Sequence, residues 1–232
     1  MTDFWIDNVS VHCERGESIL QAALAAGVEI THLCEDKLLE TGGKCGLCLV
    51  EIEGKQEPVL SCQTYPEDGM RVSTDTPKVH AAVKMRAEKL FADHPMDCAV
   101  CSKTGECVIQ KICVKYQPEL KPNKQPVRKR KLLDWVLCAD EKCVGCGKCA
   151  AFLKKAGVGN YDVMPPVSCP PFSLSGMLAD KCPSGALTNA AASELWRRWD
   201  TKQVQSIDVT DGVGAKINIS AAEGKIVQVV PA

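Results

Sequence analysis

Residues 34–62 read CEDKLLETGGKCGLCLVEIEGKQEPVLSC and hold four cysteines, separated by ten, two and thirteen residues. Iron in an iron–sulfur cluster takes four terminal ligands, and soft thiolate sulfur matches the metal and supplies compensating negative charge. Glycines at positions 42, 43 and 46 flank the second cysteine, where residues without Cβ let backbone N–H groups approach cluster sulfides. The segment predicts a loop around a two-iron cluster. Its ligands, which we name the first group, are Cys34, Cys45, Cys48 and Cys62.

Zinc is the alternative metal for this segment, because zinc also accepts four cysteines. Structural zinc sites usually pair two short CxxC-like knuckles. Only one short pair is present between residues 34 and 62. We therefore favour iron.

A second group of candidate ligands lies in residues 94–107, which read HPMDCAVCSKTGEC. These ligands are His94, Cys98, Cys101 and Cys107. An imidazole in place of a thiolate removes one negative charge and alters a cluster's potential. His94 stands three residues before a CxxC pair, which favours ligation, whereas His12 and His80 are expected at the surface and His32 beside the first group.

A third group begins with residues 143–149, CVGCGKC, whose two gaps of two residues are the signature of a four-iron cluster. A two-cluster ferredoxin would carry a further cysteine after a gap of three residues, where this chain has Leu153. The fourth ligand must then come from a distance, either from Cys182 before Pro183 or from Cys169 before Pro170. We favour Cys182. The third group is Cys143, Cys146, Cys149 and Cys182.

The remaining cysteines are expected to be buried thiols that behave as small hydrophobic residues. They are Cys13, Cys113, Cys138 and Cys169. The total of 15 is odd, the CxxC pairs are tight, and no signal peptide opens the chain, so metal ligation is favoured over disulfides.

Composition excludes several classes of protein. The 232 residues carry a net charge of −1, which argues against bulk nucleic-acid binding. No apolar stretch reaches the roughly 18 residues that span a bilayer, so any membrane association is expected to be indirect, through a partner. One basic stretch, Lys121 to Lys131, is interpreted as a solvated linker, with a partner-docking surface as the alternative.

The pattern predicts an α+β chain that begins with a β-grasp 2Fe–2S ferredoxin domain. Residues 4–11 alternate like a hairpin, Ser18 can cap a helix that ends before Gly27, and strand-like segments follow at 47–53, 59–60 and 70–73. A helix is expected over 77–91, then small helical and loop 4Fe–4S domains, and a short β-rich tail after Trp196.

The expected domain boundaries follow these patterns. They are residues 1–75 for the ferredoxin-like domain, 76–117 for a helix with the four-iron site of one histidine and three cysteines, 118–134 for the basic linker, 135–190 for the other four-iron domain, and 191–232 for the tail. The sequence contains no GxGxxG after a strand, no P-loop and no nucleophile elbow, so we expect no catalytic residues and place any flavin or nicotinamide site in another chain.

The order of these motifs resembles the amino-terminal half of the large iron–sulfur subunit of respiratory complex I, also called the 75 kDa subunit. The similar passages are CGLCLVEIEG at 45–54, HPMDC with its CxxC and GEC at 94–107, CPSGALT at 182–188, and SIDV at 206–209 after Trp199. The last passage resembles the opening of a molybdopterin-oxidoreductase-like region, which residues 191–232 would contain in truncated form.

The resemblance implies one 2Fe–2S cluster on the first group and two 4Fe–4S clusters on the second and third groups. It also implies an electron-transfer subunit of a proton-translocating NADH:quinone oxidoreductase, without a substrate site of its own. Its partners would be a flavin- and NADH-binding subunit and other peripheral-arm subunits. The expected location is the matrix side of the mitochondrial inner membrane or the cytoplasmic face of a bacterial membrane.

Two alternatives share some of these motifs. One is an iron–sulfur subunit of the diaphorase module of an NAD-linked hydrogenase or formate dehydrogenase, although such diaphorase subunits normally carry further four-iron motifs. The other, without redox chemistry, is a zinc-stapled assembly scaffold. Visible absorption and metal content distinguish iron with sulfide from zinc.

Overall fold

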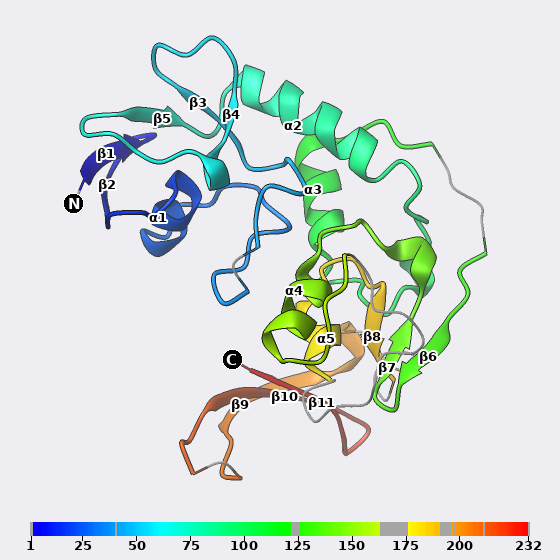
Figure 1. The fold of residues 1–232 in the computed structure, drawn as a ribbon. Coiled ribbons are helices and arrows are strands. Elements are labelled where there is room, and N and C mark those ends of the chain that lie inside the picture. Colours follow the sequence, from blue (N-terminus) through cyan, green and yellow to red (C-terminus); the bar gives the residue numbers. More distant parts are fainter. Residues whose placement is uncertain are drawn as a thin grey trace. The chain divides into compact units, whose positions relative to one another are not determined.

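The computed structural model describes residues 2–39, 41–121, 126–162, 176–190, 196, 198–210 and 212–231. The chain divides into two compact units, whose elements are labelled in Figure 1. Unit 1 comprises Met1–His94, Lys111–Asn123 and Val144–Met164, and unit 2 comprises Pro95–Gln110, Lys124–Cys143 and Pro165–Ala232. Each unit collects separate segments of the sequence, and the division into five segments expected from the sequence stays a prediction.

A five-stranded sheet forms the amino-terminal part of unit 1, with strand order β2-β1-β5-β3-β4. Its strands are β1 (Thr2–Ile6), β2 (Val9–Cys13), β3 (Leu49–Ile52), β4 (Val59–Leu60) and β5 (Arg71–Ser73). Strands β1 and β5 are parallel and the other neighbours antiparallel. The predicted hairpin and later strands are confirmed, within two residues at each end.

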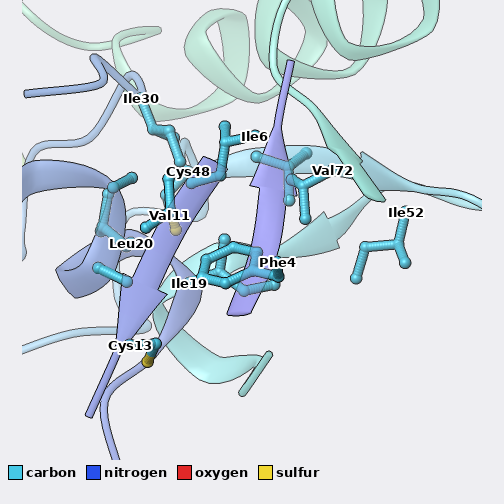
Figure 2. Close-up of a cluster of buried hydrophobic side chains, with 13 residues drawn as sticks. Phe4, Ile6, Val11, Cys13, Ile19, Leu20, Ile30, Cys48, Ile52 and Val72 are labelled. Atoms are coloured by element: carbon cyan, nitrogen blue, oxygen red, sulfur yellow. The ribbon is translucent and has the colours of Figure 1, made fainter. Parts of the chain in front are cut away.

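Helix α1 (Ile19–Ala25) packs against this sheet and completes its core. Alternate strand residues point to one face, as the two-residue period of a strand requires, and the helix supplies the opposite layer. Figure 2 shows Phe4, Ile6 and Val11 gathered with Ile19 and Leu20. Burying each of these side chains contributes about 1.5–3 kcal/mol, so the core anchors the loops that leave the sheet.

The start and end of α1 follow from local chemistry. Ser18 Oγ accepts a hydrogen bond of 3.3 Å from the backbone N–H of Gln21, and the Gln21 side chain accepts one of 3.0 Å from the Ser18 N–H. This reciprocal capping satisfies two N–H groups at the start of the helix. Gly27 follows the helix with φ +73°, a conformation that glycine adopts without strain. The predicted cap and terminator are both confirmed.

Three further helices contribute to unit 1. Helix α2 (Pro77–Leu90) begins after the capping residue Thr76 and buries Val79, Val83 and Ala87, as predicted. Helix α3 (Val108–Tyr116) has residues in both units, and its Tyr116 hydroxyl lies 2.7 Å from the Thr31 hydroxyl in unit 1. Helix α4 (Lys148–Lys155) follows the CxxC pairs of the third group.

Unit 2 contains two three-stranded antiparallel sheets and a short helix. One sheet has the order β6-β7-β8 and the other β11-β10-β9. The elements are β6 (Arg130–Leu133), β7 (Val136–Cys138), α5 (Met177–Lys181), β8 (Leu187–Asn189), β9 (Lys202–Ile207), β10 (Lys216–Ala222) and β11 (Lys225–Pro231). The β-rich tail expected from the sequence corresponds to the second sheet.

The carboxy-terminal end of the basic stretch Lys121 to Lys131 forms a strand, whereas the sequence predicts a solvated linker. Residues 122–125 of this stretch lie outside the described part of the chain. Arg130 and Lys131 belong to β6, and Arg130 donates two hydrogen bonds, of 3.0 and 2.9 Å, to the carboxylate of Asp140. Leu132 and Leu133, directly after the basic residues, are buried. Burial of these two leucines together with a two-pronged ion pair explains why a strand forms there.

Three short 3-10 turns carry a candidate ligand or directly precede one: η1 (Ser61–Gln63), η2 (Cys98–Val100) and η3 (Asp140–Lys142). A further turn, η4 (Arg198–Asp200), lies before β9. None of the helices in the described part of the chain has the length and apolar character needed to cross a membrane.

Candidate iron–sulfur sites

All four cysteines of the first group lie in unit 1. Cys34, Cys45 and Cys48 are buried, and Cys62 on η1 is half-buried. Cys48 also belongs to the hydrophobic core, where Figure 2 shows its side chain among those of the sheet and α1. Cys62 packs against the same core, and Cys34 and Cys45 lie on the preceding segment between α1 and β3.

The four thiols form two pairs. Cys34 hydrogen-bonds with Cys45, which raises the pKa of Cys34 and lowers the pKa of Cys45 to about 6. Cys48 pairs with Cys62 in the same way, so its pKa is raised and that of Cys62 is lowered. Each pair thus brings two thiols together, and the thiolate is the form of cysteine that binds metal.

Polar side chains hold the backbone of this group in place. Ser61 Oγ donates a hydrogen bond of 2.8 Å to the Cys48 carbonyl, and Thr41 Oγ1 donates one of 2.6 Å to the Cys34 carbonyl. Arg86, from α2, donates from Nε to the Cys45 carbonyl at 2.6 Å. These three donors hold the backbone at Cys34, Cys45 and Cys48 in place.

Glycine is required next to the second cysteine. Gly46 has φ +70°, and a Cβ at this position would lie 2.7 Å from Arg86 Nε. A Cβ on Gly42 would lie 2.8 Å from Glu35 Oε2 and 3.9 Å from Cys62 Sγ. The four thiols and the close backbone approach fit a two-iron cluster, as the sequence predicts.

Glu35, next to the first ligand, links the loop to α1. Its carboxylate is buried and accepts a hydrogen bond of 3.3 Å from the side chain of Gln21. Burial raises the pKa of Glu35, while the hydrogen bond from Gln21 acts in the opposite direction. The residue that completes the cap of α1 therefore also orders the approach to Cys34.

The second group is divided by the units, with His94 in unit 1 and its three cysteines in unit 2. Within unit 2, Cys101 and Cys107 are buried and Cys98 is half-buried. Burial is the main cause of the raised pKa of the Cys107 thiol. His94 itself is half-buried. The three cysteines lie on a loop that begins at η2 and ends at α3.

The loop that carries Cys182 packs against the cysteines of the second group within unit 2. Cys107 Sγ lies 3.9 Å from the Pro183 carbonyl. Gly185 has φ +75°, and a Cβ there would lie 3.4 Å from Cys101 Sγ. The passage CPSGALT thus places a glycine where the chain passes close to a ligand sulfur.

The third group is also divided, with Cys146 and Cys149 in unit 1 and Cys143 and Cys182 in unit 2. In unit 2, Cys182 is buried and its sulfur accepts a hydrogen bond of 3.3 Å from the backbone N–H of Leu187. Such N–H bonds to cluster ligands are one of the ways a protein sets a cluster's potential. The competing candidate Cys169 lies outside the described residues.

Within unit 1, the segment that carries Cys146 and Cys149 of the third group contacts the loop that carries the first group. Gly147, between Cys146 and Cys149, has φ +77°, and a Cβ there would lie 2.7 Å from Lys44 Nζ. At the far end of α4, Lys155 Nζ donates to the Leu38 carbonyl. Helix α4 is therefore attached to residues that lie between the first two ligands of the first group.

The cysteines and histidines assigned other roles mostly agree with expectation. Cys13 and Cys138 are buried, and burial with a hydrogen bond to Asp140 raises the pKa of Cys138 to about 12. Cys113, on α3, is only half-buried rather than buried. His12 is exposed and His80 and His32 are half-buried.

Two charged residues near the ligands carry no signature in the sequence. Arg86 precedes the second group in sequence but contacts the first, and Lys142 is a buried lysine 2.8 Å from Asp97. Among the described residues, no three His, Cys, Asp or Glu side chains converge closely enough to hold a single metal ion.

Comparisons with known proteins match two regions of the chain. Residues 1–77 match the family model of a 2Fe-2S iron-sulfur cluster binding domain. Residues 84–119 match that of the NADH-ubiquinone oxidoreductase-G iron-sulfur binding region. A 2Fe–2S domain and a region that binds an iron–sulfur cluster are therefore present in this order.

Curated relatives extend the likeness over the whole chain. The NADH-ubiquinone oxidoreductase 75 kDa subunit of Reclinomonas americana is 31% identical over 100% of this chain and 36% of its own length. The mitochondrial NADH dehydrogenase (ubiquinone) iron-sulfur protein 1 of Solanum tuberosum is 32% identical, over 99% and 33%. A subunit of the NADH-quinone oxidoreductase of Rickettsia prowazekii is 31% identical, over 97% and 36%. The chain spans about a third of these relatives.

A solved structure shares the fold. A chain in the crystal structure of an NAD+-reducing NiFe-hydrogenase in the H2-reduced state superposes with a TM-score of 0.71 and 25% identity. The match covers 83% of this chain and 88% of that one.

Proposed function

Because the whole chain is a relative of the large iron–sulfur subunits of NADH-quinone oxidoreductase, we propose that it is the electron-transferring part of such a complex. The observation that carries this proposal is the first group, in which four thiols and a glycine-lined loop gather on a ferredoxin-like sheet. Iron–sulfur clusters supply one-electron chemistry when bound. The role of this chain is to hold such centres at fixed positions.

The proposed assignment is one 2Fe–2S cluster and two 4Fe–4S clusters. The four thiols of the first group, Cys34, Cys45, Cys48 and Cys62, would hold the two-iron cluster. The second group would hold one four-iron cluster and the third group the other. The hydrogen bond to the buried Cys182 sulfur supports Cys182 over Cys169 as the distant ligand.

Contacts within each unit link the third group to one of the other two groups. In unit 1, Lys44 of the first group's loop lies against Gly147 of the third group. In unit 2, Cys107 of the second group lies against Pro183, beside Cys182 of the third. The third group therefore has one part beside the first group within unit 1 and another part beside the second group within unit 2.

The donor to this chain is proposed to be a flavin- and NADH-binding subunit, with other peripheral-arm subunits as further partners. The sequence contains ligands for one-electron centres but no dinucleotide fingerprint, so hydride chemistry needs another chain. In such a complex the chain would lie on the matrix side of the mitochondrial inner membrane or the cytoplasmic face of a bacterial one. It would contact the membrane only through its partners.

Reconstitution with a flavin-bearing partner tests this function. The iron-loaded chain should accept electrons from dithionite, yet oxidise no NADH until the flavin subunit is added. A Cys45→Ser variant should interrupt NADH-to-quinone electron flow in the assembled complex while leaving flavin reduction intact, and Cys13→Ser is the matched control. NADH–ferricyanide activity from the isolated, flavin-free chain would contradict the proposal.

A second candidate is the corresponding subunit of an NAD-reducing hydrogenase, which the structural likeness over 88% of the hydrogenase chain favours. The first candidate is preferred, because diaphorase subunits of NAD-linked hydrogenases normally carry four-iron motifs beyond the three groups of this chain. The separating measurement is the acceptor: a complex that contains this chain reduces quinone with NADH in the first case, and couples NAD+ reduction to hydrogen oxidation in the second.

A further inference from the structure

Lys142 is a buried lysine of unit 2, with a side chain only 3% exposed. It directly precedes Cys143 of the third group, at the end of η3. Its ammonium lies 2.8 Å from the carboxylate of Asp97, which directly precedes Cys98 of the second group. One ion pair thus joins the two ligand-bearing loops of unit 2.

The ammonium also contacts a ligand sulfur. Burial alone would lower the pKa of Lys142, but the hydrogen bond to Asp97 and the interaction with Cys101 raise it. Lys142 donates a hydrogen bond to the Cys101 side chain as well as to Asp97. The buried ion pair with Asp97 therefore places the ammonium of Lys142 beside the sulfur of Cys101.

The burial of Lys142 determines how strongly its positive charge acts on neighbouring groups. Removing a lysine from water is costly, so a buried ammonium is retained only where it is paired. Asp97 is itself only 29% exposed, so its charge is also poorly screened. A positive charge in such surroundings acts on nearby groups far more strongly than one in solvent.

We propose that Lys142 sets the reduction potential of the four-iron site to which Cys101 belongs, with Asp97 as its positioning partner. This inference rests on the proposed function, because it assumes iron on the second group. One-electron reduction adds negative charge to the ligands and their metal, and the ammonium of Lys142 stabilises that reduced form. The Asp97 carboxylate opposes this effect and holds the ammonium in place.

The two members of the pair should then act in opposite directions. Lys142→Met removes the positive charge at similar length, so the midpoint potential of the second-group centre should fall. Asp97→Asn removes the opposing negative charge, so the same potential should rise. Lys142→Arg keeps the charge and should restore a potential near that of the unaltered chain. A residue with a purely structural role would not produce shifts of opposite sign.

The matched control is the exposed ion pair Lys131–Asp134 in the same unit. Its N–O distance is also 2.8 Å, but its side chains are 65% and 79% exposed. Lys131→Met should leave every potential unchanged, because solvent screens the charge.

The experiment is a dithionite redox titration of the full, anaerobically reconstituted chain, followed by EPR. A lower midpoint potential in Lys142→Met and a higher one in Asp97→Asn support the proposal. If Lys142→Met fails to bind iron, a higher potential in Asp97→Asn together with an unchanged potential in Lys142→Arg supports it. Unchanged potentials in both neutral variants, shifts in the same direction, or loss of the signal in Lys142→Arg would overturn it. Absence of any four-iron signal from the unaltered chain would instead overturn the proposed function.

Discussion

Arg86 Nε donates a hydrogen bond of 2.6 Å to the carbonyl oxygen of Cys45, across 41 residues of sequence. The same guanidinium donates from Nη2 to the Lys44 carbonyl at 3.3 Å. Helix α2 thereby fixes the loop that carries the second ligand of the first group. The ferredoxin-like sheet and the helix that follows it are therefore joined at the cluster loop.

Replacing Arg86 with leucine should weaken the first site. The loss of hydrogen bonds from a charged donor costs about 1.5–3 kcal/mol, and the two carbonyls are left without this donor. We expect the visible absorption of the two-iron cluster to bleach faster with a chelator and at a lower temperature. Lys89→Leu, at an exposed position on the same helix, is the control and should change stability by less than about 0.5 kcal/mol. Equal bleaching in both variants would contradict the role of Arg86.

Gly46→Ala should damage the same loop by a different route. The positive φ alone costs an alanine about 1–2 kcal/mol, and the new Cβ would also meet Arg86 Nε at 2.7 Å. Gly69→Ala isolates the first cost, because Gly69 has φ +73° with nothing within 4 Å. Urea unfolding should therefore show a larger loss for Gly46→Ala than for Gly69→Ala. Equal losses of unfolding free energy in the two variants would contradict this prediction, because they would show that the Arg86 side chain moves away from the new Cβ without cost.

Local patterns account for the parts of the fold that could be predicted from the sequence. The hairpin, the Ser18 cap and the end of α1 at Gly27 each depend on residues close together in the chain, and so do the CxxC pairs. Arg86 and Lys142 could not be found in this way, because each meets its partner across more than 40 residues. Strand β6 is not predicted because the basic stretch is interpreted as solvated, whereas Arg130 pairs with Asp140, ten residues later, once the chain has turned back.

Removing the Ser18 cap should destabilise unit 1 and loosen the approach to Cys34. Ser18→Ala leaves the Gln21 N–H without its acceptor, which typically costs about 1 kcal/mol. Because Gln21 also donates to Glu35, we expect an added effect on the first cluster, measured as faster iron loss to a chelator. Thr76→Ala removes the cap of α2 and serves as the comparison. Iron loss that is no faster than in Thr76→Ala would show that the cap acts on the helix alone.

The distant ligand of the third group can be identified by paired substitutions. Cys182→Ala should abolish one four-iron EPR signal, because the buried Cys182 sulfur is the one held by the Leu187 N–H. Cys169→Ala should leave that signal intact. The reverse pattern would assign the ligand to Cys169.

The central claim is that this chain holds three iron–sulfur clusters, and iron and acid-labile sulfide analysis of the anaerobically reconstituted chain tests it most directly. One two-iron and two four-iron clusters predict about ten irons per chain, with a matching amount of sulfide and a brown colour. Four or fewer irons, accompanied by stoichiometric zinc in a colourless protein, would contradict it.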